Sequence, residues 1–214
     1  MSEPTTSARS LLRVAPGVLR WHILDERISA PSDAYAVVHG GEVTLIDPLP
    51  LTPGAQRSLE RRGRITAICL TGAFHQRSAW RYRRAYGAKV YGPRGGERFE
   101  EKPDVLYRPG DRLPGGLLAV HAPGPASAHY AFLLSRAPGV LFCADLLANM
   151  GDRKGGLRFI ESEYQEDPAR TRRSARKMLD LTFRVACFAH GAPVTRLARQ
   201  ALAGALERDA RLGD

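Results

Sequence analysis

The stretch LTGAFHQRSAW occupies residues 70–80 and is the most informative part of this chain. It follows a short apolar run that predicts a strand, and it leads into an Arg-rich segment at 77–86 that predicts a helix. Loops between a strand and a helix often carry functional side chains, because the rigid elements on either side hold them in place. Three polar side chains of this loop are therefore the first candidates for a site: His75, Gln76 and Arg77.

The size and composition predict one domain. A chain of 214 residues can bury a core without disulfides or structural metals. Its three cysteines show no CxxC spacing, which favours reduced, buried thiols over a disulfide framework or a zinc knuckle. No apolar run approaches the ~20 residues of a membrane span, and residues 1–13 lack the apolar stretch of a secretory signal. We therefore expect a cytoplasmic protein without a membrane partner.

The net charge of +10 raises the question of a polyanionic partner. Nearly all of the basic residues are arginines, and they are spread over several predicted helices instead of forming one tract. An excess of basic residues indicates how a protein associates and dissolves more than what it does. Nucleic acid is therefore not the partner that the sequence favours.

The chain is predicted to begin with strands and then to mix strands with helices. Residues 1–13 are polar and are expected to be disordered, while 14–214 form a single domain. The turn Gly40-Gly41 predicts a hairpin, because glycine adopts the positive φ of a tight turn. Strands are predicted at 18–24, 34–39, 42–46, 65–70, 89–91, 117–121, 131–135, 140–144 and 184–189, and helices at 53–62, 77–86, 167–182 and 194–212. The expected fold class is α/β (α+β), a four-layer αββα sandwich of two mixed β-sheets flanked by helices.

Six landmarks occur in the order that the metallo-β-lactamase superfamily shows. They are VAPGVLRW at 14–21, EVTLIDPLP at 42–50 with Asp47, the loop at 71–77, HAPGPASAHYAFLL at 121–134, VLFCADLL at 140–147 with Asp145, and CFAHGAPV at 187–194 with His190. The chain resembles this superfamily, which includes hydrolases of the glyoxalase II type, over residues 14–212. In active relatives two zinc, iron or manganese ions share a bridging water that attacks an ester, amide or thioester.

The family's THxHxDH signature is largely replaced at residues 71–77. Of the seven ligand positions that the resemblance implies, Asp145 and His190 are retained. The other five carry Gly72, Phe74 and Pro125 at the first metal and Gln76 and Arg77 at the second. The resemblance therefore implies a degenerate member that has lost its dinuclear site, and we expect no bound metal.

Arg77 is the most informative of these substitutions. A guanidinium is permanently charged and has no lone pair to offer a metal. We expect Arg77 to fill the volume of the missing ions and to pair with Asp145, with His190 hydrogen-bonded nearby, because a buried carboxylate without a partner is costly. A phenylalanine at position 74 would make the same cavity drier.

A rearranged site with one metal ion is the alternative. His75, Asp145 and His190, together with His129, could supply the three ligands that a catalytic zinc, iron or manganese ion needs besides water. Neighbouring residues of an extended loop point to opposite sides, so His75 would have to turn inward where Phe74 is expected. We therefore expect His75 to face solvent or a carbonyl group.

Two functions follow from these observations. The first is a metal-independent, non-catalytic protein whose cleft binds a small molecule or a partner protein, and the second is a hydrolase of a small ester, lactone or thioester that uses the mononuclear site. The cleft is expected to be lined by Gly72, Phe74, His75, Gln76, Arg77, Pro125, His129, Asp145 and His190. No catalytic residue is assigned beyond the candidates Asp145, His190 and His75. The sequence leaves a homodimer open, and the Gly- and Pro-rich residues 92–116 could fold over the cleft.

Overall fold

A computed structural model describes residues 3–96, 99–151 and 156–212 of the chain. The strands are β1 Leu12–Ala15, β2 Val18–Asp25, β3 Ala30–His39, β4 Glu42–Ile46, β5 Arg64–Cys69, β6 Lys89–Pro93, β7 Val105–Tyr107, β8 Arg112–Leu113, β9 Leu117–His121, β10 Tyr130–Leu134, β11 Val140–Phe142, β12 Ala148–Asn149, β13 Leu157–Arg158 and β14 Val185–Cys187. The α-helices are α1 Pro53–Glu60, α2 Ala79–Tyr86, α3 Pro168–Met178 and α4 Ala198–Leu212. Short 3₁₀ turns include η1 Ala73–His75, η3 Ala144–Leu146 and η5 Ser162–Tyr164.

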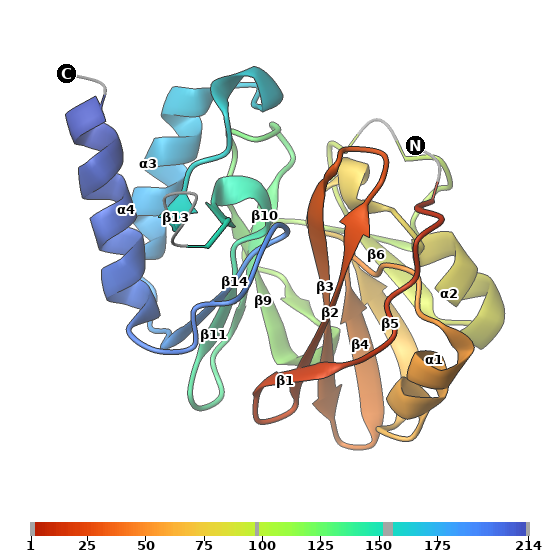
Figure 1. The fold of residues 1–214 in the computed structure, drawn as a ribbon. Coiled ribbons are helices and arrows are strands. Elements are labelled where there is room, and N and C mark those ends of the chain that lie inside the picture. Colours follow the sequence, from red (N-terminus) through yellow and green to blue (C-terminus); the bar gives the residue numbers. More distant parts are fainter. Residues whose placement is uncertain (1–2, 97–98, 152–155, 213–214) are drawn as a thin grey trace.

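The strands form two large mixed sheets that pack face to face between two layers of helices (Figure 1). One sheet has seven strands in the order β1-β2-β3-β4-β5-β6-β7, and the other has five in the order β14-β11-β10-β9-β8. Helices α1 and α2 cover the outer face of the first sheet, and α3 and α4 cover the outer face of the second. The predicted four-layer αββα sandwich is therefore confirmed.

Three apolar layers hold the four structural layers together. Successive residues of a strand point to opposite faces of its sheet, so Ile68 packs under α1 and α2 while Cys69 points into the space between the sheets. On the other side, Ala186 contacts the layer under α3 and α4, and Cys187 returns to the space between the sheets. All three cysteines are buried and free, as expected from their spacing.

The elements differ from the predicted ones mainly at helix starts. The Gly40-Gly41 hairpin is confirmed, with φ of 57° and 77° at the two glycines. Helix α2 starts at Ala79 and not at Arg77, because Arg77 has a φ of 42° that no right-handed helix accepts. Helix α4 starts at Ala198, since Val194 forms a β-bridge with Ala186 instead of a helical turn.

Residues 3–13 lie against the domain, although their polar composition predicted disorder for 1–13. Ala8 is buried, and its backbone exchanges hydrogen bonds with Pro50 and Thr52. The side chain of Glu26 accepts bonds from Thr5. Backbone groups paired in this way are tied to the domain whatever the composition of their side chains. Residues 1–2 lie outside the described residues.

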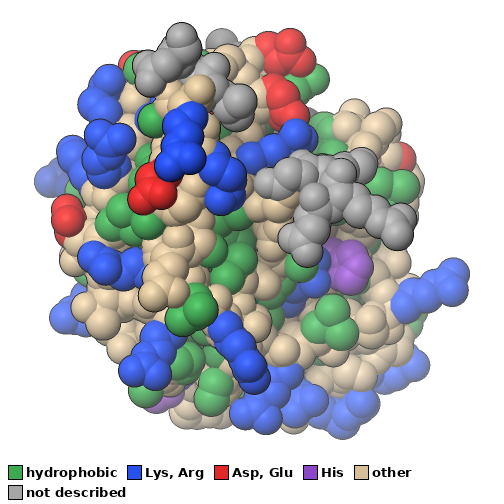
Figure 2. Space-filling model, turned by 60° about the vertical axis from the view of Figure 1, so that its left-hand side comes forward, with side chains coloured by type: hydrophobic (Ala, Val, Ile, Leu, Met, Phe, Trp, Pro, Cys, Tyr) green, Lys and Arg blue, Asp and Glu red, His purple; other side chains and the backbone are tan. Residues whose placement is uncertain are grey.

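The arginines lie on several elements, as the sequence suggested. Figure 2 shows Lys and Arg side chains scattered over the face formed by α3 and α4, interrupted by apolar and acidic side chains. In the described part of the chain, no helix is both long and apolar enough to cross a lipid bilayer.

Tyr35 joins the two sheets through the core. Its hydroxyl donates to the carbonyl oxygen of Phe188 at 2.8 Å and accepts from the amide of the same residue at 3.1 Å. Tyr35 belongs to β3, and Phe188 directly follows β14 in the other sheet. The contact fixes the backbone two residues before His190.

Replacing Tyr35 by phenylalanine should lower the free energy of unfolding by about 1–3 kcal/mol, because both backbone groups of Phe188 lose their buried partner. Urea denaturation followed by circular dichroism measures this change. Tyr164→Phe is the control, since Tyr164 is 70% exposed and should change stability by less than about 0.5 kcal/mol. Equal midpoints for the two variants would contradict the role of this bond.

Candidate functional site

Three side chains from distant parts of the sequence meet near the ends of β5, β11 and β14. They are His75 in η1, Asp145 in η3 and His190 after β14. His75 Nε2 lies 3.1 Å from Asp145 Oδ2, and His190 Nε2 lies 3.4 Å from Asp145 Oδ1. The three side chains are 5%, 13% and 17% exposed. We call them the His75–Asp145–His190 cluster, and their ligand atoms all lie within 4.8 Å of one another.

The backbone around the cluster is strained. Asp47, Arg77 and Ala144 have positive φ values of 45°, 42° and 49°, which residues with a side chain rarely adopt. Each such residue costs on the order of 1–3 kcal/mol and persists only where the surroundings enforce it. Each of the three lies within two residues of a cluster member or contacts one. The strain therefore marks the segments that aim the cluster.

His75 points inward, contrary to the expectation that it would face solvent or a carbonyl group. It is only 4% exposed. The sequence argument assumed an extended loop, but η1 turns the chain, so Phe74 and His75 do not alternate about a straight backbone. Their rings instead meet edge to face, with centroids 4.5 Å apart.

Thr71 and Asp47 fix the orientation of the His75 ring. The Thr71 hydroxyl lies 2.5 Å from Asp47 Oδ2, and a carboxylate can only accept, so the hydroxyl donates to Asp47. His75 Nδ1 lies 2.7 Å from the same hydroxyl and 3.0 Å from Asp47 Oδ2, and it must therefore carry a proton. Nε2 is then the nitrogen that faces Asp145.

The pKa values of His75 and Asp145 move in opposite directions. Burial lowers the pKa of the His75 imidazole, but the charges of Asp145 and Asp47 outweigh it, and the net pKa is raised. Burial raises the pKa of the Asp145 carboxyl, but His75 and His190 outweigh this effect and hold the pKa well below its ordinary value. Without a metal, the two groups therefore form an imidazolium–carboxylate pair.

His190 is held by a backbone carbonyl. Its Nδ1 lies 2.8 Å from the oxygen of Pro31, and a carbonyl oxygen only accepts, so Nδ1 carries the proton. In the neutral ring Nε2 then directs a lone pair at Asp145 Oδ1. That oxygen is buried and makes no hydrogen bond to any described residue. With the ring neutral, two acceptors would face each other, so this contact requires a proton or a metal ion at His190 Nε2.

His129 cannot serve as a further ligand in this arrangement. It is fully buried, its Nδ1 donates to the oxygen of Ala122 at 2.7 Å, and its Nε2 accepts from the Asp145 amide at 3.2 Å. Burial lowers the pKa of His129 to about 4, so the ring is neutral near pH 7. His129 therefore positions the backbone of Asp145, while the carboxylate of Asp145 contacts His75 and His190.

The predicted pairing of Arg77 with Asp145 is wrong. Arg77 is buried, and its Nη1 donates to the carbonyl oxygens of Asp33 at 2.7 Å and Asp47 at 3.3 Å. Among the described residues, Asp145 has only histidines as charged partners. Because Arg77 has a left-handed backbone conformation, its side chain starts away from the helical direction and bonds to a carbonyl group within β3 and to one directly after β4.

Phe74 fills the side of the site where the resemblance places the first metal. A Cβ atom on Gly72 would lie 2.7 Å from the Phe74 ring, so a side chain at position 72 and this ring exclude each other. The ring also lies parallel to that of His129, with centroids 6.2 Å apart. These contacts agree with the expectation that the Phe74 ring makes this side of the site apolar.

Gln76 and Pro125 do not belong to the cluster. The Gln76 amide donates to the oxygen of Ala73 and accepts from Trp80 Nε1 and the amide of Glu100, which ties the loop to α2. Pro125 has no side-chain donor or acceptor, and its carbonyl accepts from the amide of Glu166. Of the nine predicted cleft residues, three thus form the cluster, and Phe74 and His129 pack beside it.

Backbone contacts at residues 33 and 191 position His190. Asp33 Oδ2 accepts from the amide of Gly191 at 2.6 Å, and Arg20 neutralises the same carboxylate. Gly191 has a φ of 95°, and a Cβ atom there would lie 1.8 Å from the oxygen of Asn149 in β12. Only glycine allows β12 to lie this close to the histidine loop.

Sequence reasoning missed the supporting residues Asp47, Thr71 and Pro31. In the sequence, Asp47 stands out only as part of the landmark at 42–50, and Thr71 only as the first residue of the loop at 71–77. Their positions directly after β4 and β5, two neighbouring parallel strands, could have placed them together. The contact of Pro31 is made by its backbone, and no sequence pattern indicates it.

The donor set fits one metal ion and does not fit two. Tetrahedral ligands with bonds of ~2.0 Å lie about 3.3 Å apart. The two histidine nitrogens lie 3.1 and 3.4 Å from the two different oxygens of Asp145, and one ligand atom from each of the three residues lies within 4.8 Å of the others. Two imidazole nitrogens and a carboxylate are a common set for catalytic zinc. Gly72, Phe74 and Pro125 offer the first metal no ligand, and the Arg77 charge opposes a second cation beside Gln76.

Comparisons with known proteins agree on the fold. No protein-family model matches the sequence, and no curated protein sequence matches it. Three similar solved structures are TMB-1 (12% identity, 96% of this chain and 99% of that chain, TM-score 0.73), a metallo-β-lactamase family protein from Thermus thermophilus (19%, 94% and 82%, 0.67) and a metallo-β-lactamase from Erythrobacter litoralis (14%, 92% and 92%, 0.66). Identities this low speak for architecture and not for activity. The chain has the metallo-β-lactamase fold.

Proposed function

We propose that the His75–Asp145–His190 cluster binds a single zinc, iron or manganese ion and that the protein hydrolyses a small ester, lactone or thioester there. The proposal follows the alternative that the sequence left open, because the geometry favours it over the metal-free cleft. Loss of the dinuclear site remains part of the proposal.

The main support for this proposal is the unsatisfied contact between His190 and Asp145. The carbonyl of Pro31 takes the Nδ1 proton of His190, so a neutral ring presents a lone pair to an oxygen that is itself short of a donor. An arrangement of two facing acceptors is unfavourable unless a proton or a metal ion lies between them. A metal ion bound to both would remove the conflict.

The supporting contacts are of the kind that metal sites use. Histidine ligands commonly donate their second N–H to a carbonyl or a carboxylate, which fixes the tautomer and the ring orientation. His190 does this through Pro31, and His75 does it through Thr71 and Asp47. Both Nε2 atoms are thereby turned toward Asp145.

The chain's own residues would orient a substrate and exclude water. A bound ion supplies Lewis acidity and lowers the pKa of a coordinated water. Asp47 and Thr71 fix the orientation of the His75 ring, and His129 accepts a hydrogen bond from the Asp145 amide. Phe74 closes one side with an apolar ring. The small exposed fractions of the cluster favour a small substrate over a polymer.

Protein purified without chelator should contain about one equivalent of metal, and His190→Ala should lower this content by roughly tenfold or more, since a ligand and its fixed lone pair are lost. Inductively coupled plasma mass spectrometry measures the metal. The same variant should lose hydrolysis of a chromogenic small ester, a lactone and a thioester. His39→Ala is the matched control, because His39 is exposed in the β3–β4 hairpin.

A native protein that holds no zinc, iron or manganese, and takes up none from added salts, would contradict the proposal. Metal retained in full by His190→Ala would contradict the assigned ligands.

Thr71→Val should weaken metal affinity by about 10- to 100-fold, because supporting partners of metal ligands have effects of this size. Valine keeps the shape of threonine and its backbone bond to Asp47, but it removes the hydroxyl that contacts both His75 Nδ1 and Asp47 Oδ2. Competition with a coloured chelator measures the affinity, and circular dichroism checks the fold. Thr71→Ser keeps the hydroxyl and should bind metal like the parent protein. Equal affinities for all three proteins would show that this contact does not orient the ligand.

A metal-independent binding protein is the second candidate, and the position of Arg77 favours it. The guanidinium lies close enough to lower the pKa of His75, and a cation beside it is disfavoured by the same charge. The His75–Asp145 ion pair then closes the site by itself. Absence of metal from the native protein, together with saturable binding of a small molecule, would favour this second function. Homodimer formation stays a prediction that light scattering would test.

A further inference from the structure

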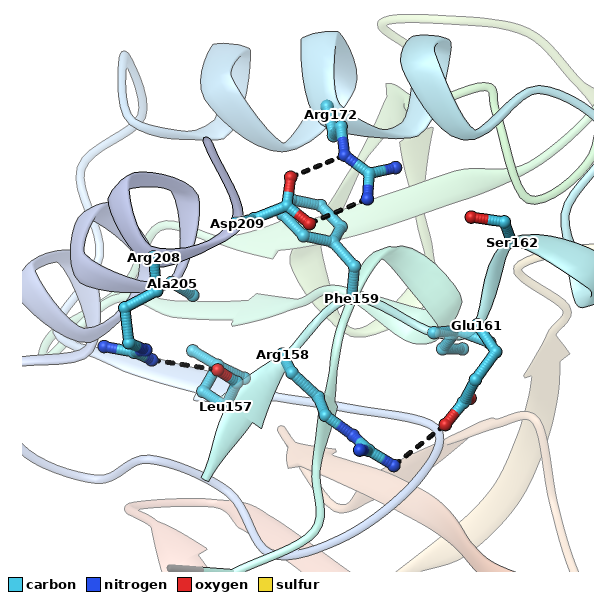
Figure 3. A pocket seen from close by; sticks show the side chains of 10 residues that line it. Leu157, Arg158, Phe159, Glu161, Ser162, Arg172, Ala205, Arg208 and Asp209 are labelled. Atoms are coloured by element: carbon cyan, nitrogen blue, oxygen red, sulfur yellow. Dashed lines mark hydrogen bonds and ion pairs between the residues drawn. The ribbon is translucent and has the colours of Figure 1, made fainter. Parts of the chain in front are cut away.

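A cavity of about 460 Å³ lies between α3, α4 and the segment around β13 and η5 (Figure 3). This volume falls within the range of small-molecule sites. The cavity shares no lining residue with the His75–Asp145–His190 cluster. Phe159 and Ile160 give it an apolar surface, and three arginines, Arg158, Arg172 and Arg208, stand around that surface.

Two of the three arginines are neutralised. Arg172 makes a two-point contact with Asp209, at 2.5 and 2.7 Å, and its guanidinium lies 4.9 Å from the centre of the Phe159 ring. Arg158 pairs with Glu161 at 2.9 Å. These pairs leave the walls polar but add no net charge.

Arg208 is the third arginine, and it carries a charge without a carboxylate partner among the described residues. Its Nη2 donates to the carbonyl oxygen of Leu157 at 3.0 Å. A guanidinium has five N–H donors, so most of its hydrogen-bonding capacity is left over. The side chains that line the cavity therefore carry one surplus positive charge.

A second cavity, of about 470 Å³ between α2 and the start of β6, also has one surplus positive charge, because Lys89 lines it and makes no ion pair with a described residue. Arg83 pairs with Asp104 at 2.7 Å, and Arg84 pairs with Glu101 at 2.6 Å. Both guanidinium groups are neutralised there, and no large apolar side chain lines the cavity. It has neither a free arginine nor a surface for an apolar group.

We propose that the cavity under α3 and α4 binds a small organic anion, a carboxylate or a phosphate monoester that carries an apolar group. The anionic end meets the free donors of Arg208, since guanidinium groups bind carboxylates and phosphates through parallel N–H donors. The apolar group packs on Phe159 and Ile160.

Titration of the ¹⁵N-labelled protein with benzoate, phenyl phosphate and inorganic phosphate tests this site. We expect saturable shifts of the amide signals of residues 157–162 with benzoate or phenyl phosphate, and at least fivefold weaker binding of inorganic phosphate, which has no apolar group. Arg208→Ala should weaken the binding of the best ligand about tenfold, because it removes a charge-assisted hydrogen bond. Arg208→Gln keeps a donor for Leu157 and should weaken binding to a similar extent while preserving the fold.

Arg84→Ala removes the same charge from the other cavity and should leave binding unchanged. His190→Ala should also leave it unchanged, which separates this site from any metal in the cluster. The proposal is overturned if neither organic anion gives saturable shifts at 157–162, if Arg84→Ala weakens binding as much as Arg208→Ala, or if inorganic phosphate binds as well as phenyl phosphate.

Discussion

The carboxylate of Asp145 has to be balanced in a nearly dry place, and the surrounding structure is arranged around that requirement. A buried charge without a partner costs several kcal/mol, so neighbouring segments must deliver positive charge or donors to it. Two imidazole rings approach it from η1 and from the loop after β14. Both have committed their Nδ1 protons elsewhere, to Thr71 and to Pro31. Only Nε2 is left on each side, and a metal ion bound there would have to compete with a proton.

Residues that stand where the resemblance implies metal ligands have structural partners of their own. Phe74 occupies the space that a side chain at position 72 would need, and Gly72 leaves that space free. Arg77 donates to a carbonyl group within β3 and to one directly after β4 instead of entering the metal volume. Gln76 ties the loop to α2 through Trp80. The loop is therefore a packed element that aims one histidine.

The order of strands and helices could be predicted from the sequence, whereas the direction of single side chains could not. Apolar periodicity and glycine turns gave the hairpin at 40–41, and Asp167 does cap α3 by accepting from the amide of Arg170. The inward turn of His75 depends on a 3₁₀ turn and on a left-handed Arg77, and neither leaves a periodic signal. The partner of Arg77 was misjudged because a guanidinium can be satisfied by carbonyl oxygens as well as by a carboxylate.

Charge balance links the metal-free and metal-bound descriptions of the cluster. Asp47 and Asp145 bring two negative charges, and Arg77 brings one positive charge close to His75. A proton on His75 makes this group neutral, which explains why the pKa of His75 is raised although the ring is buried. A divalent ion that displaces the proton leaves one positive charge, because both histidines are then neutral. Such a site gains by holding an anionic ligand, whether hydroxide or a negatively charged group of a substrate. The same residues thus favour a closed ion pair when no metal is bound and an anion when one is.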